Sequence, residues 1–315
     1  MTSILISDTF PEQYIDQLKA SDFEVLYNPE ITPDQLVAEI PQYDALIVRS
    51  RTIVTPEVIA AAKNLKIIGR VGSGVDNIAI SEAREKNIIV VNAPGANSQT
   101  VAEHTIGLML ALTRVIPATN AEMHKGTWGK KTYSGIELSG KTLGIIGFGQ
   151  IAQIVARIAV SFGMKLMVYN RTTTGEKMDT LQSLGGVFVS TEELLVASDI
   201  VTIHVSKSSE TMGMIGKKEL ELMKSSALLI NCARGGMVNE TDLVEALQNN
   251  VIAGAGLDVF SEEPLNTNSA LCNLPHVIMT PHVAAQSPEA QTRAAGMVTA
   301  DITRVLHGEN AEHAV

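Results

Sequence analysis

A glycine turn between two apolar runs constrains the fold of this chain more than any other segment. The turn, Gly147-Phe148-Gly149-Gln150-Ile151-Ala152, follows the apolar run Leu143–Ile146 and opens a helical pattern that ends at Gly163. A second apolar run, Leu166–Tyr169, comes next. This order predicts a strand, a tight turn, a helix and a parallel strand, with a pyrophosphate at the helix N-terminus. We therefore expect a dinucleotide site, in which Ala152 replaces a third glycine that only needs to be small.

The residues after the second strand indicate which dinucleotide is bound. An Asp or Glu at this point would hold the ribose 2′-OH of NAD. Here Asn170 is neutral, Arg171 is cationic, and Thr172, Thr173 and Thr174 follow. A cation beside neutral donors suits a 2′-phosphate. We therefore expect NADP(H) to be favoured, with NAD(H) as the alternative.

Composition and charge narrow the class of protein. The 315 residues are enough for two domains, and the formal net charge of −10 argues against a nucleic-acid partner. Two cysteines, Cys232 and Cys272, are too few for a disulfide framework and fit a reducing compartment. No run approaches the ~18 apolar residues of a membrane span, and the chain starts directly in a strand pattern without a signal peptide. We expect a soluble, cytoplasmic protein without a membrane or nucleic-acid partner.

Apolar runs alternate with helical patterns along the whole chain, which predicts parallel sheets with helices on both faces. A break at Asn92–Gly95 separates a first α/β unit from a second, which contains the glycine turn. A long helix is expected from about Ser98 to Arg114; Thr100 and Glu103 have capping-box spacing, with an earlier helix start as the alternative. Ser190 and Glu193 have the same spacing. The last helix, about 288 to 306, could fold back onto the first unit.

Candidate catalytic residues follow the expected strands of the second unit, where ligands bind in open α/β sheets. Arg234 precedes paired glycines and could hold a carboxylate or polarise a carbonyl, or lie on the surface. Glu262 and Glu263 form either a solvated acidic turn or a partner for His282. A histidine beside a carboxylate can exchange a proton near neutral pH, although a buried structural histidine is the alternative.

Arginines gather after two strands of the first unit. Arg49 and Arg51 follow one run, and Arg70 opens a glycine turn that continues through Gly72-Ser73-Gly74 to Asp76-Asn77. Consecutive backbone N–H groups in such a turn can bind an anion. In an acidic chain this local excess of cations suggests an anionic substrate, with unrelated surface arginines as the alternative. The residues show no metal-ligand spacing and no nucleophile elbow. His104 and His204 are assigned to structure.

Taken together, these residues resemble the D-isomer-specific 2-hydroxyacid dehydrogenase family, and the resemblance covers essentially the whole chain. The matching elements occur in order: Arg70-x-Gly72-x-Gly74-x-Asp76-Asn77, Val101-Ala102-Glu103-His104, the dinucleotide turn, Asn231-x-Ala233-Arg234-Gly235, Leu257-Asp258-Val259-Phe260-x-x-Glu263-Pro264 and Thr280-Pro281-His282. The resemblance implies an α/β fold of two Rossmann-like doubly wound parallel-sheet domains, one flavodoxin-like and one NAD(P)-binding, with the active site in the cleft. It places a dinucleotide-binding domain at 97–283 and a discontinuous substrate domain at 1–96 and 284–315.

The resemblance also assigns roles to individual residues. Arg234, Glu263 and His282 are implied to be catalytic, and Glu262 does not match the family pattern. Substrate binding is implied for Arg49, Ser50, Arg51, Arg70, Ser73 and Gly74. Cofactor binding is implied for Gly147, Gly149, Gln150, Ile151, Asn170, Arg171, Thr172, His204, Val205, Cys232, Ala233, Asp258, His282 and Ala284, and no metal is expected.

Within the family, the chain looks most like the catalytic part of the branch that oxidises D-3-phosphoglycerate. In that branch arginines matching Arg49 and Arg70 contact the substrate phosphate, whereas Lys130 stands where an arginine often follows Trp128. Because the chain ends near residue 315, we expect the regulatory domains of longer members, and inhibition by serine, to be absent. We also expect a homodimer joined through the dinucleotide-binding domain.

Two alternatives remain open. Asn170-Arg171 resembles the NADP-using glyoxylate and hydroxypyruvate reductases. A nucleotide-sensing corepressor of the same fold could also retain the three catalytic residues, although the acidic charge argues against it.

Overall fold

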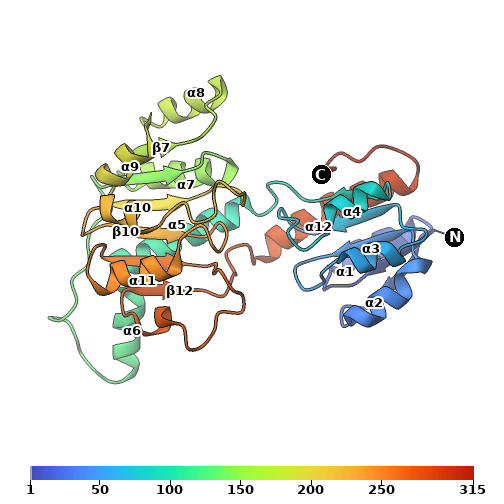
Figure 1. Cartoon of the computed structure of the whole chain (residues 1–315), viewed down its shortest axis with the longest axis horizontal. Coiled ribbons are helices and arrows are strands. Elements are labelled where there is room, and N and C mark those ends of the chain that lie inside the picture. The colour runs from blue at the N-terminus through green and yellow to red at the C-terminus, as the bar shows by residue number, and fades with distance from the viewer. Residues whose placement is uncertain (1) are drawn as a thin grey trace. The chain divides into compact units, whose positions relative to one another are not determined.

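The computed structural model describes residues 2–315 and contains two compact units, each shown in Figure 1. Unit 1 runs from the N-terminal strand to Asn97 and resumes with Gln286–Val315. Unit 2 is Ser98–Ala285. Both are built on parallel sheets, so the expected α/β class with two doubly wound domains is confirmed.

Unit 1 contains a five-stranded sheet in the order β2-β1-β3-β4-β5, and all its neighbouring strands are parallel. Its strands are β1 (Ser3–Ile6), β2 (Glu24–Tyr27), β3 (Ala45–Val48), β4 (Ile67–Arg70) and β5 (Ile89–Val91). Successive side chains point to opposite faces. Ile4 and Ile6 therefore join one apolar core while Leu5 joins the other. Burial on both faces explains why these strands are continuous apolar runs.

Five helices cover the two faces of this sheet: α1 (Glu12–Ala20), α2 (Pro33–Glu39), α3 (Pro56–Ala61), α4 (Ile80–Glu85) and α12 (Pro288–Leu306). Helices α1 and α12 contribute Leu18, Val298 and Ile302 to one core, and α2 to α4 pack into the other. The short 3₁₀ turn Ile40–Gln42 follows α2. The last helix, α12, thus lies in unit 1.

Unit 2 contains a seven-stranded parallel sheet in the order β12-β11-β10-β9-β6-β7-β8. Its strands are β6 (Thr142–Ile146), β7 (Lys165–Tyr169), β8 (Val187–Phe188), β9 (Ile200–Ile203), β10 (Leu228–Asn231), β11 (Gly254–Leu257) and β12 (Val277–Met279). The strand order reverses between β6 and β9, which pair directly. In open α/β sheets such a switch point is where ligands bind, beyond the carboxyl ends of the strands.

The helices of unit 2 are α5 (Ser98–Thr113), α6 (Ile116–His124), α7 (Gln150–Ser161), α8 (Gly175–Ser183), α9 (Thr191–Ala197), α10 (Lys217–Leu222) and α11 (Glu240–Gln248), with a 3₁₀ turn at Ala270–Asn273. Helix α6 has no buried residue, whereas the others contribute to the cores on the two faces of the sheet. Helices α5 and α7 share one core, and α9 to α11 share the other. Among the described residues, no helix has the length and apolar character needed to cross a membrane.

The two capping boxes expected from the sequence have different outcomes. The Ser190 side chain accepts from the Glu193 amide, and the Glu193 carboxylate accepts from the Ser190 amide, so this box begins α9 as expected. The spacing of Thr100 and Glu103 does not mark the start of α5, which begins at Ser98, the earlier start that the sequence allowed. Glu103 accepts instead from the Gln99 side chain within the helix.

Candidate active site

The glycine turn lies at the switch point of unit 2, between β6 and α7. Gly147 has a φ of +91°, a left-handed value that glycine adopts without strain. A Cβ at this position would lie 2.5 Å from the His204 carbonyl oxygen at the end of β9. The turn can therefore close against β9 only with glycine here.

Gly149, the second glycine of the turn, leaves open space beside the backbone. A Cβ at Gly149 would meet no other atom within 4 Å, so packing within the chain does not require glycine there. Gly149 has no side chain to cap α7, whose first residue is the exposed Gln150. Ala152 is fully buried. Open space at an uncapped helix N-terminus fits the close approach of a pyrophosphate.

The Asn170 side chain, after β7, holds the glycine turn. Its Oδ1 accepts from the Phe148 amide at 2.8 Å, and its Nδ2 donates to the Thr172 carbonyl oxygen. Arg171 is exposed and forms an ion pair with the exposed Glu210. Exposed pairs are worth about 0–1 kcal/mol, so a phosphate could recruit this guanidinium at little cost.

Two titratable groups at the ends of the central strands are kept neutral by burial. Burial lowers the pKa of His204 to about 4, and the ring Nε2 lies 3.0 Å from Thr202 Oγ1. Burial raises the pKa of the Cys232 thiol to about 12. Neither group exchanges a proton readily near neutral pH. Beside them, Val205 and Ala233 are half-buried, as is Ile151 in the first turn of α7.

A histidine–carboxylate pair stands beyond β11 and β12. His282 Nδ1 lies 2.7 Å from Glu263 Oε2, and the other Glu263 oxygen accepts from the Phe260 amide at 3.0 Å. Both side chains are partly exposed. With Nδ1 directed at the carboxylate, Nε2 is the ring nitrogen that can take a proton from a substrate. The exposed Glu262 comes one residue earlier, and the carboxylate that pairs with His282 is that of Glu263.

The loop that carries His282 is anchored by a buried carboxylate. Asp258 is 0% exposed, and its oxygens accept from the amides of Val283 and Ala284 at 2.9 and 2.8 Å. Thr280 Oγ1 donates to the same carboxylate at 2.6 Å and lies 2.9 Å from His104 Nε2. His282 itself has a φ of +52°, an uncommon conformation outside glycine that surrounding structure must stabilise.

Arg234 follows β10, the neighbour of β11. Asn231 fixes its loop by donating to the Arg234 carbonyl oxygen and accepting from the Ala233 amide. A Cβ at Gly235 would lie 1.7 Å from the Phe260 carbonyl oxygen, so the loops after β10 and β11 touch through their backbones. Arg234, Glu263 and His282 thus follow three adjacent strands of one sheet.

The arginines of unit 1 differ in their surroundings. Arg49 Nη1 donates to Thr9 Oγ1 at 2.7 Å, whereas Arg51 donates to Asp8, Ile31 and Ser7. Arg70 Nη1 donates to the Val71 carbonyl oxygen. Ser73 Oγ donates to the Ala93 carbonyl oxygen and to Asn97. Substrate binding was also implied for Ser50, which is exposed, and for Gly74, which is half-buried.

The anchoring roles of Asp258 and Asn170 and the contact of Thr9 with Arg49 were not expected from the sequence. The position of Asp258 after an apolar strand was visible in the sequence, but the amides it accepts from lie 25 residues further on. No cluster of three or more His, Cys, Asp or Glu side chains in the described part of the chain could hold a metal.

The sheet order, the glycine turn and its uncapped helix define a dinucleotide-binding protein of the doubly wound α/β class. The chain belongs to the D-isomer specific 2-hydroxyacid dehydrogenase family: the family's NAD binding domain matches residues 106–284. The resemblance found in the sequence is thereby confirmed.

Individual relatives agree with this family. A D-3-phosphoglycerate dehydrogenase from Methanocaldococcus jannaschii is 45% identical over 316 residues, which cover 100% of this chain and 59% of the relative. The chain therefore spans little more than half the length of that relative. A crystal structure of a protein from Thermus thermophilus has a TM-score of 0.92 and 32% identity, covering 100% of both chains. An NADPH-dependent glyoxylate/hydroxypyruvate reductase from Sinorhizobium meliloti has a TM-score of 0.86 and 27% identity, covering 100% of this chain and 98% of the reductase.

Proposed function

We propose that this chain is an NAD(P)-dependent oxidoreductase that oxidises D-3-phosphoglycerate to 3-phosphohydroxypyruvate, a reaction of serine biosynthesis. The observation that carries the proposal is the 2.7 Å contact between His282 and Glu263 beyond the sheet of the dinucleotide-binding unit. The relative from M. jannaschii, which matches over the whole chain, supports the choice of substrate.

The chain's own groups account for the movement of the proton. His282 Nε2 removes the proton from the C2 hydroxyl, while Nδ1 faces Glu263, whose negative charge stabilises the imidazolium that forms. Arg234 binds the C2 oxygen and the carboxylate, because its guanidinium can pair with both oxygens of a carboxylate. A bound nicotinamide cofactor would supply the hydride acceptor for C2. In unit 1, Arg49, Arg70 and the backbone at Ser73-Gly74 bind the anionic groups of the substrate.

The cofactor is proposed to be NADP(H) in preference to NAD(H). Its pyrophosphate would lie against Gly149 and the first turn of α7, where the backbone is uncapped. Arg171 would leave Glu210 to meet the 2′-phosphate. No acidic residue occupies position 170 or 171 to bind a ribose 2′-OH.

A second candidate is an NADPH-dependent glyoxylate/hydroxypyruvate reductase, which Asn170-Arg171 and the S. meliloti structure favour. Steady-state kinetics with 3-phosphohydroxypyruvate and hydroxypyruvate, each with NADH and NADPH, separates the two. We expect the higher kcat/KM for the phosphorylated keto acid. A higher kcat/KM for hydroxypyruvate would select the second candidate. Tight cofactor binding without turnover of any 2-keto acid would instead indicate a nucleotide-sensing corepressor.

We further propose that the chain forms a homodimer through unit 2. Helix α6 and the segment after it carry several exposed apolar side chains, namely Ile116, Met123, Trp128 and Ile136. A second copy covering these side chains would bury apolar surface that water otherwise contacts.

A further inference from the structure

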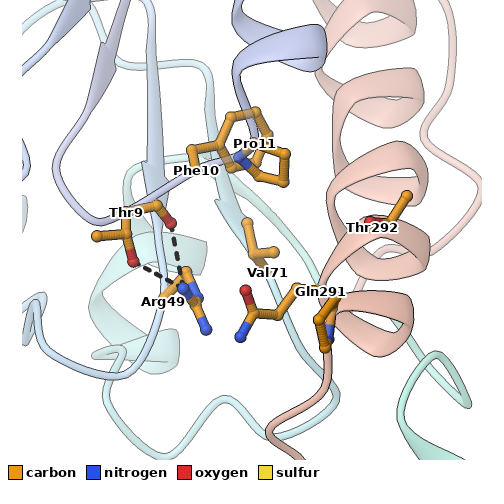
Figure 2. Close-up of a pocket in the computed structure, with 8 residues that line it drawn as sticks. Thr9, Phe10, Pro11, Arg49, Val71, Gln291 and Thr292 are labelled. Atoms are coloured by element: carbon orange, nitrogen blue, oxygen red, sulfur yellow. Dashed lines mark hydrogen bonds between the residues drawn. The ribbon is translucent and has the colours of Figure 1, made fainter.

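A pocket in unit 1 lies where the strand order of its sheet reverses. In the order β2-β1-β3-β4-β5 the switch point falls between β1 and β3, and sheets of this order bind ligands beyond those two strands. Thr9 and Phe10 follow β1, and Arg49 follows β3. These residues line a cavity of about 290 Å³, together with Val71 and the first turn of α12. Figure 2 shows Arg49 and Gln291 facing one another across it.

The lining of this pocket favours an anion. Its polar side chains are Arg49, Thr9, Gln291 and Thr292, and none of its residues is acidic. This composition contrasts with the net charge of −10 of the whole chain. A guanidinium with neutral hydrogen-bond donors around it can bind a phosphate or carboxylate with directed hydrogen bonds.

Thr9 holds the Arg49 head group in one orientation. Arg49 Nη1 donates to Thr9 Oγ1 at 2.7 Å and to the Thr9 carbonyl oxygen at 3.3 Å, as Figure 2 shows. Nη2 has a longer contact of 3.5 Å to Gln286 Oε1, which also accepts from Gln291 Nε2 at 3.0 Å. The guanidinium is therefore fixed chiefly by Thr9. A guanidinium has five N–H donors in all, which is more than these contacts use.

An ion pair between the buried Asp8 and the partly exposed Arg51 holds the two loops that carry Thr9 and Arg49. Asp8 is 3% exposed and accepts from the amides of Arg49 and Thr52, from Thr52 Oγ1 and from Arg51 Nε. The remaining Arg51 contacts, from Nη1 to Ile31 and from Nη2 to Ser7, also stay within the unit. Arg51 thus joins the β1 loop to the β3 loop, while Asn77 donates to the carbonyl oxygens of Arg49 and Thr52.

We propose, on the basis of the dehydrogenase function above, that Thr9 and the Asp8–Arg51 pair are positioning residues that set Arg49 in this pocket for the phosphate of the substrate. Arg51 then acts through the loops and does not contact the substrate. Gln291, on the opposite wall, supplies a neutral donor to the same phosphate. Selectivity for a phosphorylated substrate thus depends on Thr9 and Arg51, neither of which touches the reacting C2 atom.

The test compares Thr9→Val with Thr9→Ser in steady-state reduction of 3-phosphohydroxypyruvate and hydroxypyruvate. Loss of a hydrogen bond to a charged group should raise KM for the phosphorylated keto acid by about tenfold or more, with kcat nearly unchanged. The kinetics of hydroxypyruvate should not change, and Thr9→Ser should retain the wild-type KM. An equal effect of Thr9→Val on both substrates, or no effect on either, would overturn the proposal.

Arg51→Lys tests the ion pair, because lysine keeps the charge but loses the planar fork. We expect the same selective rise in KM, whereas Arg84→Lys, at an exposed position of α4, should change nothing. A rise in KM for both substrates alike would show a general structural role and contradict the proposal.

A direct measurement of substrate binding tests the role of Thr9 independently of the proposed reaction. Calorimetric titration of 3-phosphoglycerate into wild type and Thr9→Val needs no turnover. Binding that Thr9→Val weakens would support the pocket even if the wild type failed to reduce 3-phosphohydroxypyruvate. Equal binding by both proteins, or none by the wild type, would overturn the pocket assignment.

Discussion

At the scale of single residues, the account depends most on the carboxylate that pairs with His282. Glu263→Gln keeps the size of the side chain but removes the charge that stabilises the imidazolium. We expect kcat to fall by roughly 10²- to 10³-fold, within the range of general acid–base contributions, with little change in cofactor affinity. Glu262→Gln, one residue earlier and exposed, is the matched control and should keep wild-type kcat. Equal loss in both variants would refute the pairing.

The cofactor preference rests on Arg171. Arg171→Ala should raise KM for NADPH by about tenfold or more, the effect of losing a hydrogen bond to a charged group. The KM for NADH should stay nearly constant, because NADH lacks the 2′-phosphate. Arg157→Ala, on the exposed side of α7, should affect neither cofactor. A parallel change in both KM values would argue against recognition of the 2′-phosphate.

His204 should make stability depend on pH. Its pKa is about 4 in the folded chain and about 6.5 when unfolded. Between these values the unfolded state binds the proton more readily, so the free energy of unfolding falls as pH drops from about 6.5 to 4. Above pH 6.5 the group has no such effect. Urea unfolding at pH 7 and pH 5 should show a smaller loss in His204→Asn than in wild type.

An exposed histidine provides the control for this measurement. His124, on α6, is exposed, and His124→Asn should leave the pH dependence of unfolding as it is in the wild type. If His204→Asn lost as much stability as the wild type between pH 7 and pH 5, burial of His204 would not be the cause of the pH dependence of unfolding.

At the scale of secondary structure elements, the N-cap of α9 is the feature that the sequence identified most completely. Ser190→Ala removes the oxygen that accepts from the Glu193 amide. The free energy of unfolding should fall by about 1 kcal/mol, a typical cost for losing an N-cap. Ser183→Ala, at the exposed end of α8, removes a hydroxyl that caps no helix N-terminus and should have a much smaller effect. Urea denaturation of both variants provides the comparison.

Strands and the last helix could be predicted from the sequence because their burial leaves a local signal. Strands covered on both faces are continuous apolar runs, and α12 occupies the predicted 288–306. The first residue of α5 leaves no comparable signal in the sequence. The spacing of Thr100 to Glu103 satisfies the capping pattern, but the helix starts two residues earlier, at Ser98. Capping-box spacing shows only that the chain could form a cap at that position. Packing of buried residues such as Val101 and Ala102 determines where the helix lies.

At the scale of the whole molecule, the two sheet orders determine which loops become neighbours. The order in unit 2 brings the Gly147 turn against His204, and that in unit 1 brings Thr9 to Arg49. Motif matching predicted Glu263 and His282 as a pair, because each motif occurs beside a strand end. The contacts of Asp258, Asp8 and Arg51 could not be predicted, since they join segments 20 to 44 residues apart, largely through backbone groups that carry no sequence signal.

The central claim is that His282 exchanges the substrate proton, and its most direct test is the turnover of 3-phosphohydroxypyruvate by His282→Gln. We predict a kcat about 10²- to 10⁴-fold below wild type, the usual contribution of a general acid–base, with an unchanged Kd for the reduced cofactor. His276→Gln, the same substitution at the exposed residue before β12, should keep wild-type kcat. Equal turnover by His282→Gln and wild type would contradict the account.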